Sequence, residues 1–363
     1  MFRIRPATQR CSVGGVGTGT GGSCRDRCRC RLVIVDHRHH NRRRTTMANA
    51  VQKKYLFPSL IAVGVLLSVS ACAGGSAAGG ADDGKLKIGV TVSNSTNPFF
   101  VKESETAVSE GKALGAEVLS QEAGEDVTTQ SNQIDQFITS GVDFIVIDPV
   151  DSDGIGPAVK RAITAGIPVV GIDSETKNAS ANVTTDNTQA GQVSCVSLAE
   201  QIGGKGDIAI IDGTPIKSVS DRVAGCKAAL QAYPDIKVVA EQRGDNSRDK
   251  ALPVATDILT ANPSIVAIFA INDPTAAGVE LAAQQKGMKI VITSVDGAKA
   301  ATDDILAGGM ITATAAQDPK ALAAKGVEMG AALAKGDTLP ETLVKLPTTL
   351  IDASTAADYT PWG

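Results

Sequence analysis

The sequence predicts an α/β protein built from two doubly wound parallel sheets, and three observations lead to this prediction. From residue 85 onward, apolar runs that suit buried strands alternate with segments that have helical periodicity. Gly141, Gly166 and Gly287 each stand between a helical segment and the next strand, where helices commonly end. The alternation is also too long for one lobe, because single cores stop growing beyond roughly 250 residues.

The first predicted strand sets the pattern for the others. Its apolar positions are mostly β-branched, and Pro98 then suits the first turn of a helix, which starts at the carboxyl end of the strand. The predicted strands are 86–92, 116–120, 143–148, 167–172, 207–212, 236–240, 265–271, 288–295 and 310–315. The predicted helices are 98–114, 128–140, 154–165, 188–202, 219–232, 248–261, 274–286, 299–307 and 319–335.

The segment before this alternation has the features of a processed leader. Residues 47–71 contain two Lys residues, a short apolar run and a small-residue cleavage site, which together are typical of a secretory signal. The segment ends in Val-Ser-Ala followed by Cys72, which resembles a bacterial lipobox, so we predict that Cys72 carries a lipid anchor. Residues 72–84 are rich in Gly and Ala and are interpreted as a flexible tether. Residues 1–46 precede a second Met and are interpreted as an untranslated or disordered extension.

Charge and histidine content exclude several classes of function. Residues 72–363 contain 22 Lys and Arg residues against 37 Asp and Glu residues, a net charge of −15. Such an acidic body does not suit nucleic acid, whose phosphates require cationic partners. The three histidines all lie within residues 37–40, so the body has none for a catalytic triad, a general base or a metal site. We therefore predict no metal, no cofactor and no enzymatic activity.

Polar residues follow most of the predicted strands. In open α/β sheets, ligands bind at the carboxyl ends of the strands, so these side chains are candidates for a common site. Carboxylates and amides can pair with hydroxyl groups, and aromatic faces can cover the C–H face of a sugar ring. The candidates are Ser93, Asn97, Phe99, Phe100, Asp148, Asp173, Ser174, Asp212, Asn272, Asp273, Asp296 and Gln317. Helix capping is the competing interpretation for any single one of them, above all for Asp148 and Asp273, which precede prolines.

Two cysteines remain in the body of the chain. Cys195 and Cys226 lie on predicted helices that flank the strand at 207–212. Outside the cytoplasm, two such thiols are more often joined than free, so we predict a disulfide between them.

From residue 85 to the end, the chain resembles the ribose-type family of periplasmic sugar-binding proteins, which serve bacterial ABC importers. The resemblance implies two lobes joined by a three-crossover hinge, with boundaries at 85–185 plus 318–346 and at 186–317 plus 347–363. It also implies a monomer that delivers its sugar to a permease with an ATPase. The matching segments are Ser-Asn-Ser-Thr-Asn-Pro-Phe-Phe-Val at 93–101, Asp-Pro-Val-Asp-Ser-Asp-Gly at 148–154, Ala-Gly-Ile-Pro-Val-Val-Gly-Ile-Asp at 165–173, Thr-Asp-Asn at 185–187, Phe-Ala-Ile-Asn-Asp at 269–273, Val-Asp-Gly at 295–297 and Gln317.

The resemblance adds Arg222 and Asn246 to the candidate ligand-binding residues and also exposes three departures. Ribose binders have Arg where this chain has Ser174, an aromatic residue where it has Asn246, and Asn where it has Asp148. Loss of an Arg and an aromatic ring, with gain of a carboxylate, argues against ribose. The segments at 94–102 and 271–278 look closer to fructose-type members, so we expect a ketohexose or a related hexose, pentose or polyol.

The predicted function is therefore an extracytoplasmic, membrane-anchored receptor that binds a monosaccharide or polyol between two closing lobes and passes it to an ABC permease. A sensor lipoprotein that reports a sugar or a furanosyl signal to a membrane receptor is the alternative, and the sequence leaves it open. A transcriptional regulator with similar lobes would need a helix-turn-helix segment where this chain has its lipobox.

Overall fold

The computed structural model of the protein describes residues 84–362. The predictions for residues 1–46, for the signal at 47–71, for the lipid at Cys72 and for all but the last residue of the tether lie outside this range. Within the described range, no helix is both long and apolar enough to cross a membrane.

The first sheet has six strands in the order β11-β5-β4-β3-β1-β2. All of its neighbouring strands run parallel. Its strands are β1 (Lys87–Val92), β2 (Glu117–Glu122), β3 (Phe144–Ile147), β4 (Val169–Asp173), β5 (Ala181–Thr185) and β11 (Leu343–Leu346).

The second sheet repeats this design, with the order β12-β10-β9-β8-β6-β7. It is parallel apart from β12, which runs antiparallel to β10. Its strands are β6 (Lys205–Asp212), β7 (Asp235–Arg243), β8 (Ile265–Ala270), β9 (Val291–Asp296), β10 (Ile311–Ala316) and β12 (Thr349–Asp352). In both sheets the strand order reverses beside the first strand, and this switch point is where open α/β sheets bind ligands.

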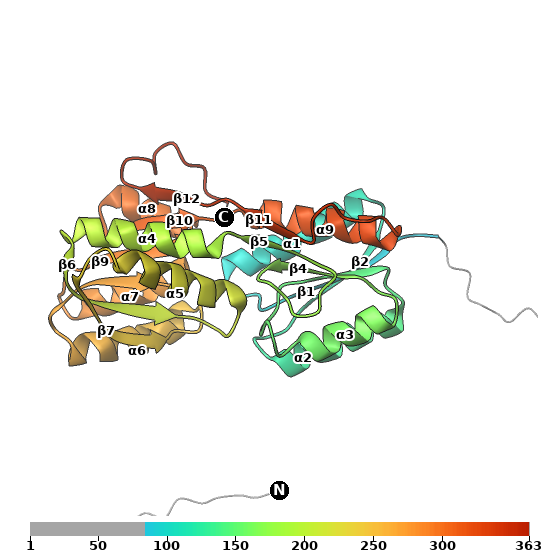
Figure 1. Cartoon of the computed structure of the whole chain (residues 1–363), viewed down its shortest axis with the longest axis horizontal. Helices are drawn as coiled ribbons and strands as arrows, with labels where there is room; N and C mark the ends of the chain where they lie inside the picture. Colours follow the sequence, from blue (N-terminus) through green and yellow to red (C-terminus); the bar gives the residue numbers. More distant parts are fainter. Residues whose placement is uncertain (1–83, 363) are drawn as a thin grey trace, which may run out of the picture. The chain divides into compact units, whose positions relative to one another are not determined.

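Helices cover both faces of each sheet (Figure 1). On the first sheet, α1 lies beside α9 and α2 lies beside α3, whereas on the second sheet α4 lies beside α5 and α6 lies beside α7. The helices are α1 (Pro98–Ala113), α2 (Val127–Ser140), α3 (Gly156–Thr164), α4 (Asn187–Gln201), α5 (Lys217–Leu230), α6 (Arg248–Ala261), α7 (Asp273–Gln285), α8 (Lys299–Ala307) and α9 (Pro319–Ala334).

Each sheet therefore carries an apolar core on both of its faces. Successive side chains of a strand point to opposite faces, so the continuous apolar run of β3 supplies both cores of the first lobe. Ile145 and Ile147 pack with residues of α2 and α3, whereas Phe144 and Val146 pack on the side of α1 and α9. In β6, Ile208 and Ile210 face α4 and α5, and the alternate residues face α6 and α7.

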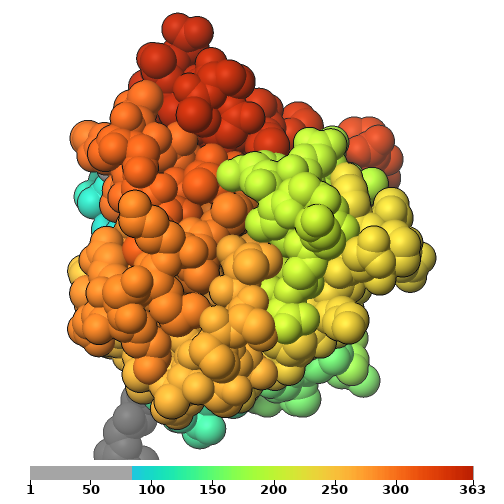
Figure 2. Space-filling model, turned by 90° about the vertical axis from the view of Figure 1, so that its left-hand side faces the viewer, coloured from blue at the N-terminus to red at the C-terminus, as the bar shows by residue number. Residues whose placement is uncertain are grey.

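The chain passes between the two sheets three times, after β5, after β10 and after β11. The last crossing carries β12 back onto the second sheet, where it pairs with β10. Figure 2 shows the C-terminal segment, in red, adjoining the second-lobe residues drawn in orange. The lobe boundaries expected from the sequence remain a proposal that agrees with these crossings.

The predicted helices agree with the observed ones to within about two residues at each end. Gly141, Gly166 and Gly287 follow α2, α3 and α7 with φ values of 63°, 84° and 65°, which is the left-handed conformation that helix ends favour. Three strands were not predicted: β5, β11 and β12. They have five, four and four residues.

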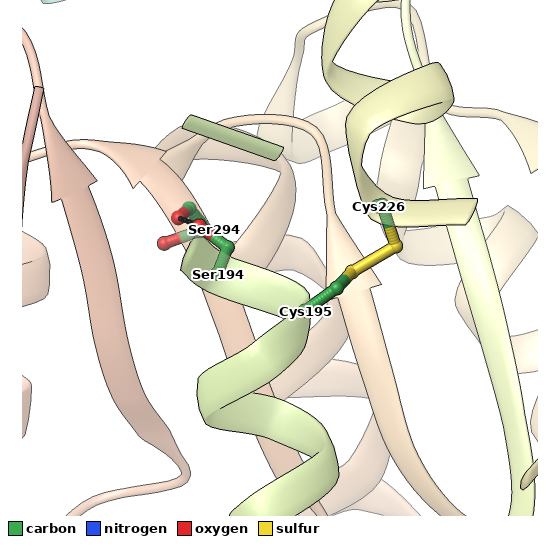
Figure 3. Close-up of a disulfide and its surroundings, with 4 residues drawn as sticks. All are labelled: Ser194, Cys195, Cys226 and Ser294. Carbon is green, nitrogen blue, oxygen red and sulfur yellow. Dashed lines mark hydrogen bonds between the residues drawn. A yellow bond between two sulfur atoms is a disulfide. The ribbon is translucent and has the colours of Figure 1, made fainter. Parts of the chain in front are cut away.

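Helices α4 and α5 approach each other closely and are covalently joined. A Cβ atom added to Gly191 would lie 1.9 Å from the carbonyl oxygen of Arg222, so only glycine allows this contact. The predicted disulfide between Cys195 and Cys226 is present, with the two Cα atoms 5.0 Å apart (Figure 3). On the same helix, Ser194 Oγ donates a hydrogen bond of 2.8 Å to the carbonyl oxygen of Ser294 in β9. Helix α4 is thus joined to α5 by a disulfide and to β9 by a hydrogen bond.

We predict that the Cys195→Ala/Cys226→Ala double variant loses about 3 kcal/mol of unfolding free energy. The bridge closes a loop with a sequence separation of 31 residues, and removing it restores conformational entropy to the unfolded chain. Urea unfolding of the oxidised wild type, the reduced wild type and the double variant measures the effect. Identical midpoints for the oxidised and reduced wild type would contradict the prediction.

Candidate functional site

Nine of the fourteen candidate ligand-binding residues line one cavity between the lobes. Its open volume is only about 10 Å³, roughly the space of one water molecule, so the lobes must separate to admit a solute. The nine residues are Asn97, Phe99, Phe100, Asp173, Arg222, Asn246, Asn272, Asp296 and Gln317.

The first lobe contributes two aromatic rings from the start of α1. Asn97 is the N-cap of this helix, and its Oδ1 accepts a hydrogen bond of 3.0 Å from the backbone N–H of Phe99. The rings of Phe99 and Phe100 meet edge to face with centroids 6.0 Å apart. Both residues belong to the apolar core of the lobe and also line the cavity, so the core fixes the rings that face it.

Two carboxylates enter the cavity from opposite lobes on unusual backbone conformations. Asp173 ends β4 with a φ of 59°, and Asp296 ends β9 with a φ of 135°. Non-glycine residues rarely adopt such angles, and strain of this kind concentrates at functional sites. The two strand ends therefore aim their carboxylates at the cost of local strain.

Arg222 of α5 is only 4% exposed, so it is a buried residue and not a surface arginine. Its Nε donates to Asn187 Oδ1 at 2.7 Å, and its Nη1 donates to the carbonyl oxygen of Ile271 at 3.1 Å. The same Nη1 lies 3.9 Å from Asp296 Oδ1. These contacts hold the guanidinium in the wall of the second lobe beside a carboxylate.

The amides of the second lobe extend this polar wall. Gln317 Nε2 donates to Asp296 Oδ1 at 2.9 Å and fixes that carboxylate. Asn272 caps α7, because its Oδ1 accepts from the N–H of Thr275 at 3.0 Å. Its Nδ2 makes a long contact of 3.4 Å with the carbonyl oxygen of Asn246. The cavity thus combines donors and acceptors with aromatic edges, which suits a hydroxylated ligand.

Five candidates do not line the cavity: Ser93, Asp148, Ser174, Asp212 and Asp273. Asp148 is fully buried, and its Oδ2 accepts from the backbone N–H of Ser93 at 3.0 Å. Ser174 contacts the start of α5 in the second lobe. Contact of Ser93, Asp148 and Ser174 with a ligand stays a prediction.

Ser152 and Ser174 of the first lobe cap helix α5 of the second lobe. The preceding residue, Ile216, has no side-chain oxygen that could cap the helix itself. Instead, Ser152 Oγ accepts from the N–H of Lys217 at 2.9 Å, and Ser174 Oγ accepts from the N–H of Ser218 at 3.0 Å. The two hydroxyl groups are 3.1 Å apart. Because a helix leaves its first N–H groups unpaired, this interlobe cap favours the closed arrangement of the lobes.

We predict that Ser152→Ala/Ser174→Ala increases hydrogen exchange at the amides of Lys217 and Ser218. Loss of a helix cap costs about 0.5 to 2 kcal/mol, which corresponds to faster exchange by a factor of about 2 to 30. The matched control is Ser104→Ala/Ser120→Ala, because those hydroxyl groups are also 3.1 Å apart but lie within the first lobe. Equal exchange in both double variants would rule out the interlobe cap.

Four residues at or near the cavity were missed from the sequence. Ile216 and Ser218 line it from the start of α5. Trp362 donates from Nε1 to the carbonyl oxygen of Asp296 at 2.9 Å, and its ring meets that of Phe99 edge to face at 5.5 Å. Glu103 is fully buried on α1, four residues after Phe99. This spacing places a charged residue on the apolar face of the helix, and that signal could have identified it.

Burial dominates the electrostatics of the carboxyl groups in this region. It raises the pKa of Asp173 to about 6, although the charge of Arg222 acts in the opposite direction. Burial also raises the pKa of Asp148, Asp296 and Glu103 well above the ordinary range, and the neighbouring carboxylates add to the shift. Asp273, which accepts hydrogen bonds from Ser294, Thr314 and Ala298, has its pKa raised to about 6 by burial. Within residues 84–362, no group of His, Cys, Asp or Glu side chains could hold a metal ion.

These shifts predict that the ligand-free protein becomes more stable when the pH is lowered from 7 to 5. With folded-state pKa values of about 6 for Asp173 and Asp273, the folded state binds protons that the unfolded state, with a pKa of about 3.9, does not. Each such group contributes up to about 1.4 kcal/mol per pH unit between these values. Urea unfolding at pH 7, 6 and 5 measures the trend, and a steady fall of stability over this window would contradict it.

The fold and the cavity define a two-lobed protein that binds a small solute at the facing edges of two parallel sheets. The chain belongs to the family described as periplasmic binding protein domain, whose family model matches residues 88–338.

Individual relatives agree with this membership. The chain is 31% identical over 261 residues to a ribose import binding protein of Bacillus subtilis, covering 71% of this chain and 85% of the relative. It is 32% identical over 277 residues to a xylitol-binding protein of Mycolicibacterium smegmatis, covering 75% and 78%. Among solved structures, the chain is similar to an ABC transporter solute-binding protein of Mycobacterium smegmatis with bound glycerol. The TM-score is 0.74 and the identity is 31%, and the match covers 77% of this chain and 98% of that one. These relatives are described as binding proteins.

Proposed function

We propose that this protein is an extracytoplasmic lipoprotein that binds one monosaccharide or polyol between its lobes and delivers it to an ABC permease with its ATPase. The ligand class includes ketohexoses such as fructose, other hexoses, pentoses and polyols. The lipid on Cys72 would hold the protein, as a monomer, at the outer face of the bacterial cell membrane.

The observation that carries the proposal is the composition of the cavity. Two aromatic rings from one lobe face a wall of carboxylates, amides and one guanidinium, and the two lobes contribute jointly. The C–H face of a sugar ring can cover aromatic edges while its hydroxyl groups pair with the polar wall. The relatives named for ribose and xylitol, and the one solved with glycerol, support a hydroxylated solute.

Binding at this cavity also explains how a solute would act on the lobes. Asn97, Phe100 and Asp173 come from the first lobe, whereas Arg222 and Asp296 come from the second. A solute that contacts both sets stabilises the closed form relative to an open one, since only the closed form offers all the contacts. The interlobe cap of α5 adds to the same closed form without touching the solute.

The test is calorimetric titration of the purified protein with fructose, ribose, xylose, galactose, glucose, xylitol and other polyols, and with glucosamine, galactosamine, 1-amino-1-deoxyfructose and 1-amino-1-deoxysorbitol. The proposal predicts saturable one-to-one binding of at least one of these solutes. Binding should weaken in Phe100→Ala, whereas Phe137→Leu, a change in the core away from the cavity, should leave affinity unchanged. Absence of binding by every hydroxylated solute, with or without an amine, would refute the proposal.

A further inference from the structure

The cavity and its surroundings contain more carboxyl groups than cationic groups. Asp173 and Asp296 line the cavity, and of the described residues that line it, Arg222 is the only cation. Two further carboxyl groups, Asp148 and Glu103, are fully buried and lie near enough to Asp173 to interact with it electrostatically. The four carboxyl groups are thus accompanied by one guanidinium in the lining of the cavity.

Arg222 already makes two hydrogen bonds and one ion pair, and none of them is to an acid of the first lobe. Its Nε and Nη1 bond to Asn187 and to the backbone of Ile271, and Nη1 lies 3.9 Å from Asp296 Oδ1. Among the described residues its one ion pair is with Asp296, and its charge lowers the pKa of Asp173 without such a contact. The first-lobe acids therefore have no ion-pair partner among the described residues that line the cavity.

Several oxygens of these acids have no hydrogen-bond partner among residues 84–362, although they are buried. They are Oδ1 of Asp148, Oδ1 of Asp173 and both carboxyl oxygens of Glu103. The nearest side-chain donor to Asp173 is Ser218 Oγ, which lies 3.5 Å from Oδ2 and is too far for a strong bond. Asp173 lines the cavity, so its unpartnered oxygen is a candidate acceptor for a solute that enters there.

These buried carboxyl oxygens lack hydrogen-bond donors, and the first-lobe acids lack an ion-pair partner among the described residues. A hydroxyl group supplies a donor but no charge, whereas a protonated amine supplies both and has no acceptor to satisfy. A metal ion does not fit, because the described side chains form no group that could hold one. A protonated amine beside Asp173 would favour the ionised form of that carboxyl, to which Arg222 makes no hydrogen bond or ion pair among the described residues.

We propose that the solute is an amino sugar or an amino polyol, whose protonated amine binds against Asp173 in the field of Asp148 and Glu103. This inference rests on the proposed function, since it specifies the class of hydroxylated solute that the cavity binds. The hydroxyl groups of the solute pair with Asn97, Asn272, Asp296 and Gln317, and the ammonium group faces the first-lobe acids.

The test compares solutes that differ only in one group, by calorimetric titration at pH 7. The pairs are glucosamine with glucose, galactosamine with galactose, 1-amino-1-deoxyfructose with fructose, and 1-amino-1-deoxysorbitol with sorbitol. In at least one pair the amine should bind about tenfold or more tightly than its hydroxyl counterpart, as expected for hydrogen bonds to a charged group. N-acetylation removes the charge and should abolish this preference.

Two variants that remove a carboxyl group test whether Asp148 and Glu103 cause the preference for the amine. Asp148→Asn keeps an acceptor for the N–H of Ser93 but removes the charge, and Glu103→Gln makes the same change on α1. Each should reduce the amine-to-hydroxyl affinity ratio by a factor of about three or more. The matched control is Asp153→Asn. Asp153 lies five residues after Asp148, and its side chain is 83% exposed, so the amine-to-hydroxyl affinity ratio should not change in this variant.

The outcomes separate this inference from the function on which it rests. If no amine binds more tightly than its hydroxyl counterpart while a neutral solute of the panel binds, the amine inference is wrong and the proposed function stands. If the ratio is the same in wild type, Asp148→Asn and Glu103→Gln, the assignment to these acids is overturned. If no solute of the whole panel binds, both proposals fail.

Discussion

Replacing Asp296 with alanine should lower the affinity for the solute by a factor of about 30 to several thousand. The expected loss is about 2 to 5 kcal/mol, the usual cost of removing a buried, charged hydrogen-bond partner of a bound molecule. Gln317, which bonds to Asp296 Oδ1 at 2.9 Å, and Arg222, at 3.9 Å, hold this carboxyl in place. Titration of wild type and variant with a solute that binds the wild type measures the loss.

The control for this variant is Asp303→Ala. Asp303 is also an acid of the second lobe, but its side chain is 58% exposed and pairs with Lys299 at the surface. Its removal should leave affinity within about a factor of two, because surface ion pairs contribute little. If the two variants bind equally well, Asp296 does not contact the solute.

Replacing Arg222 with methionine should lower the unfolding free energy at pH 7.5 by about 3 to 5 kcal/mol, the usual loss when a buried ion pair is broken on one side. The guanidinium is the cation beside Asp173 and Asp296, and it lowers the pKa of both. Without it, these buried carboxylates would be uncompensated. Methionine keeps much of the side-chain volume, so the change tests charge more than packing.

The stability lost by Arg222→Met should become smaller as the pH falls. Loss of Arg222 raises the folded-state pKa of the two acids further, so protonation relieves the repulsion as the pH drops below these values. Arg161→Met is the control, since Arg161 bridges Asp135 with a side chain that is 46% exposed and should contribute about 1 kcal/mol or less. A loss from Arg222→Met no larger than that of the control would contradict the account.

The regular elements could be predicted because the sequence marks them locally. Buried parallel strands such as β3 and β8 are continuous apolar runs, and Pro98 marks the start of α1. Strands β5, β11 and β12 lack this signal, because they are short and mix apolar with polar residues. They become strands by pairing with neighbours that are distant in sequence, and β12 does so in the antiparallel direction.

Only part of the site could be predicted, because some of its residues come together only through contacts between the lobes. Residues at the carboxyl ends of strands, such as Asp173 and Asp296, were expected because parallel sheets gather those ends at one edge. Ile216 and Ser218 were missed because they lie at the start of a helix and not at the end of a strand. Contact of Ser174 with the solute stays a prediction, whereas the cap that its hydroxyl group makes on a helix of the other lobe was not predicted. Such interlobe contacts have no signal in the local sequence.

The identity of the solute depends on finer features than the fold. Relatives of similar identity are named for ribose and for xylitol, so family membership does not select one ligand. The features that we expect to distinguish the ligand of this chain are the three departures in its sequence, Asp148, Ser174 and Asn246.

A crystal structure of the protein grown with the solute found by titration is the most direct test of the proposed binding site. We expect density for one solute molecule in the cavity between the lobes, within hydrogen-bond distance of Asp173 and Asp296 and against the ring of Phe99 or Phe100. Density for the solute at any other place, with this cavity filled by water alone, would refute the proposed site.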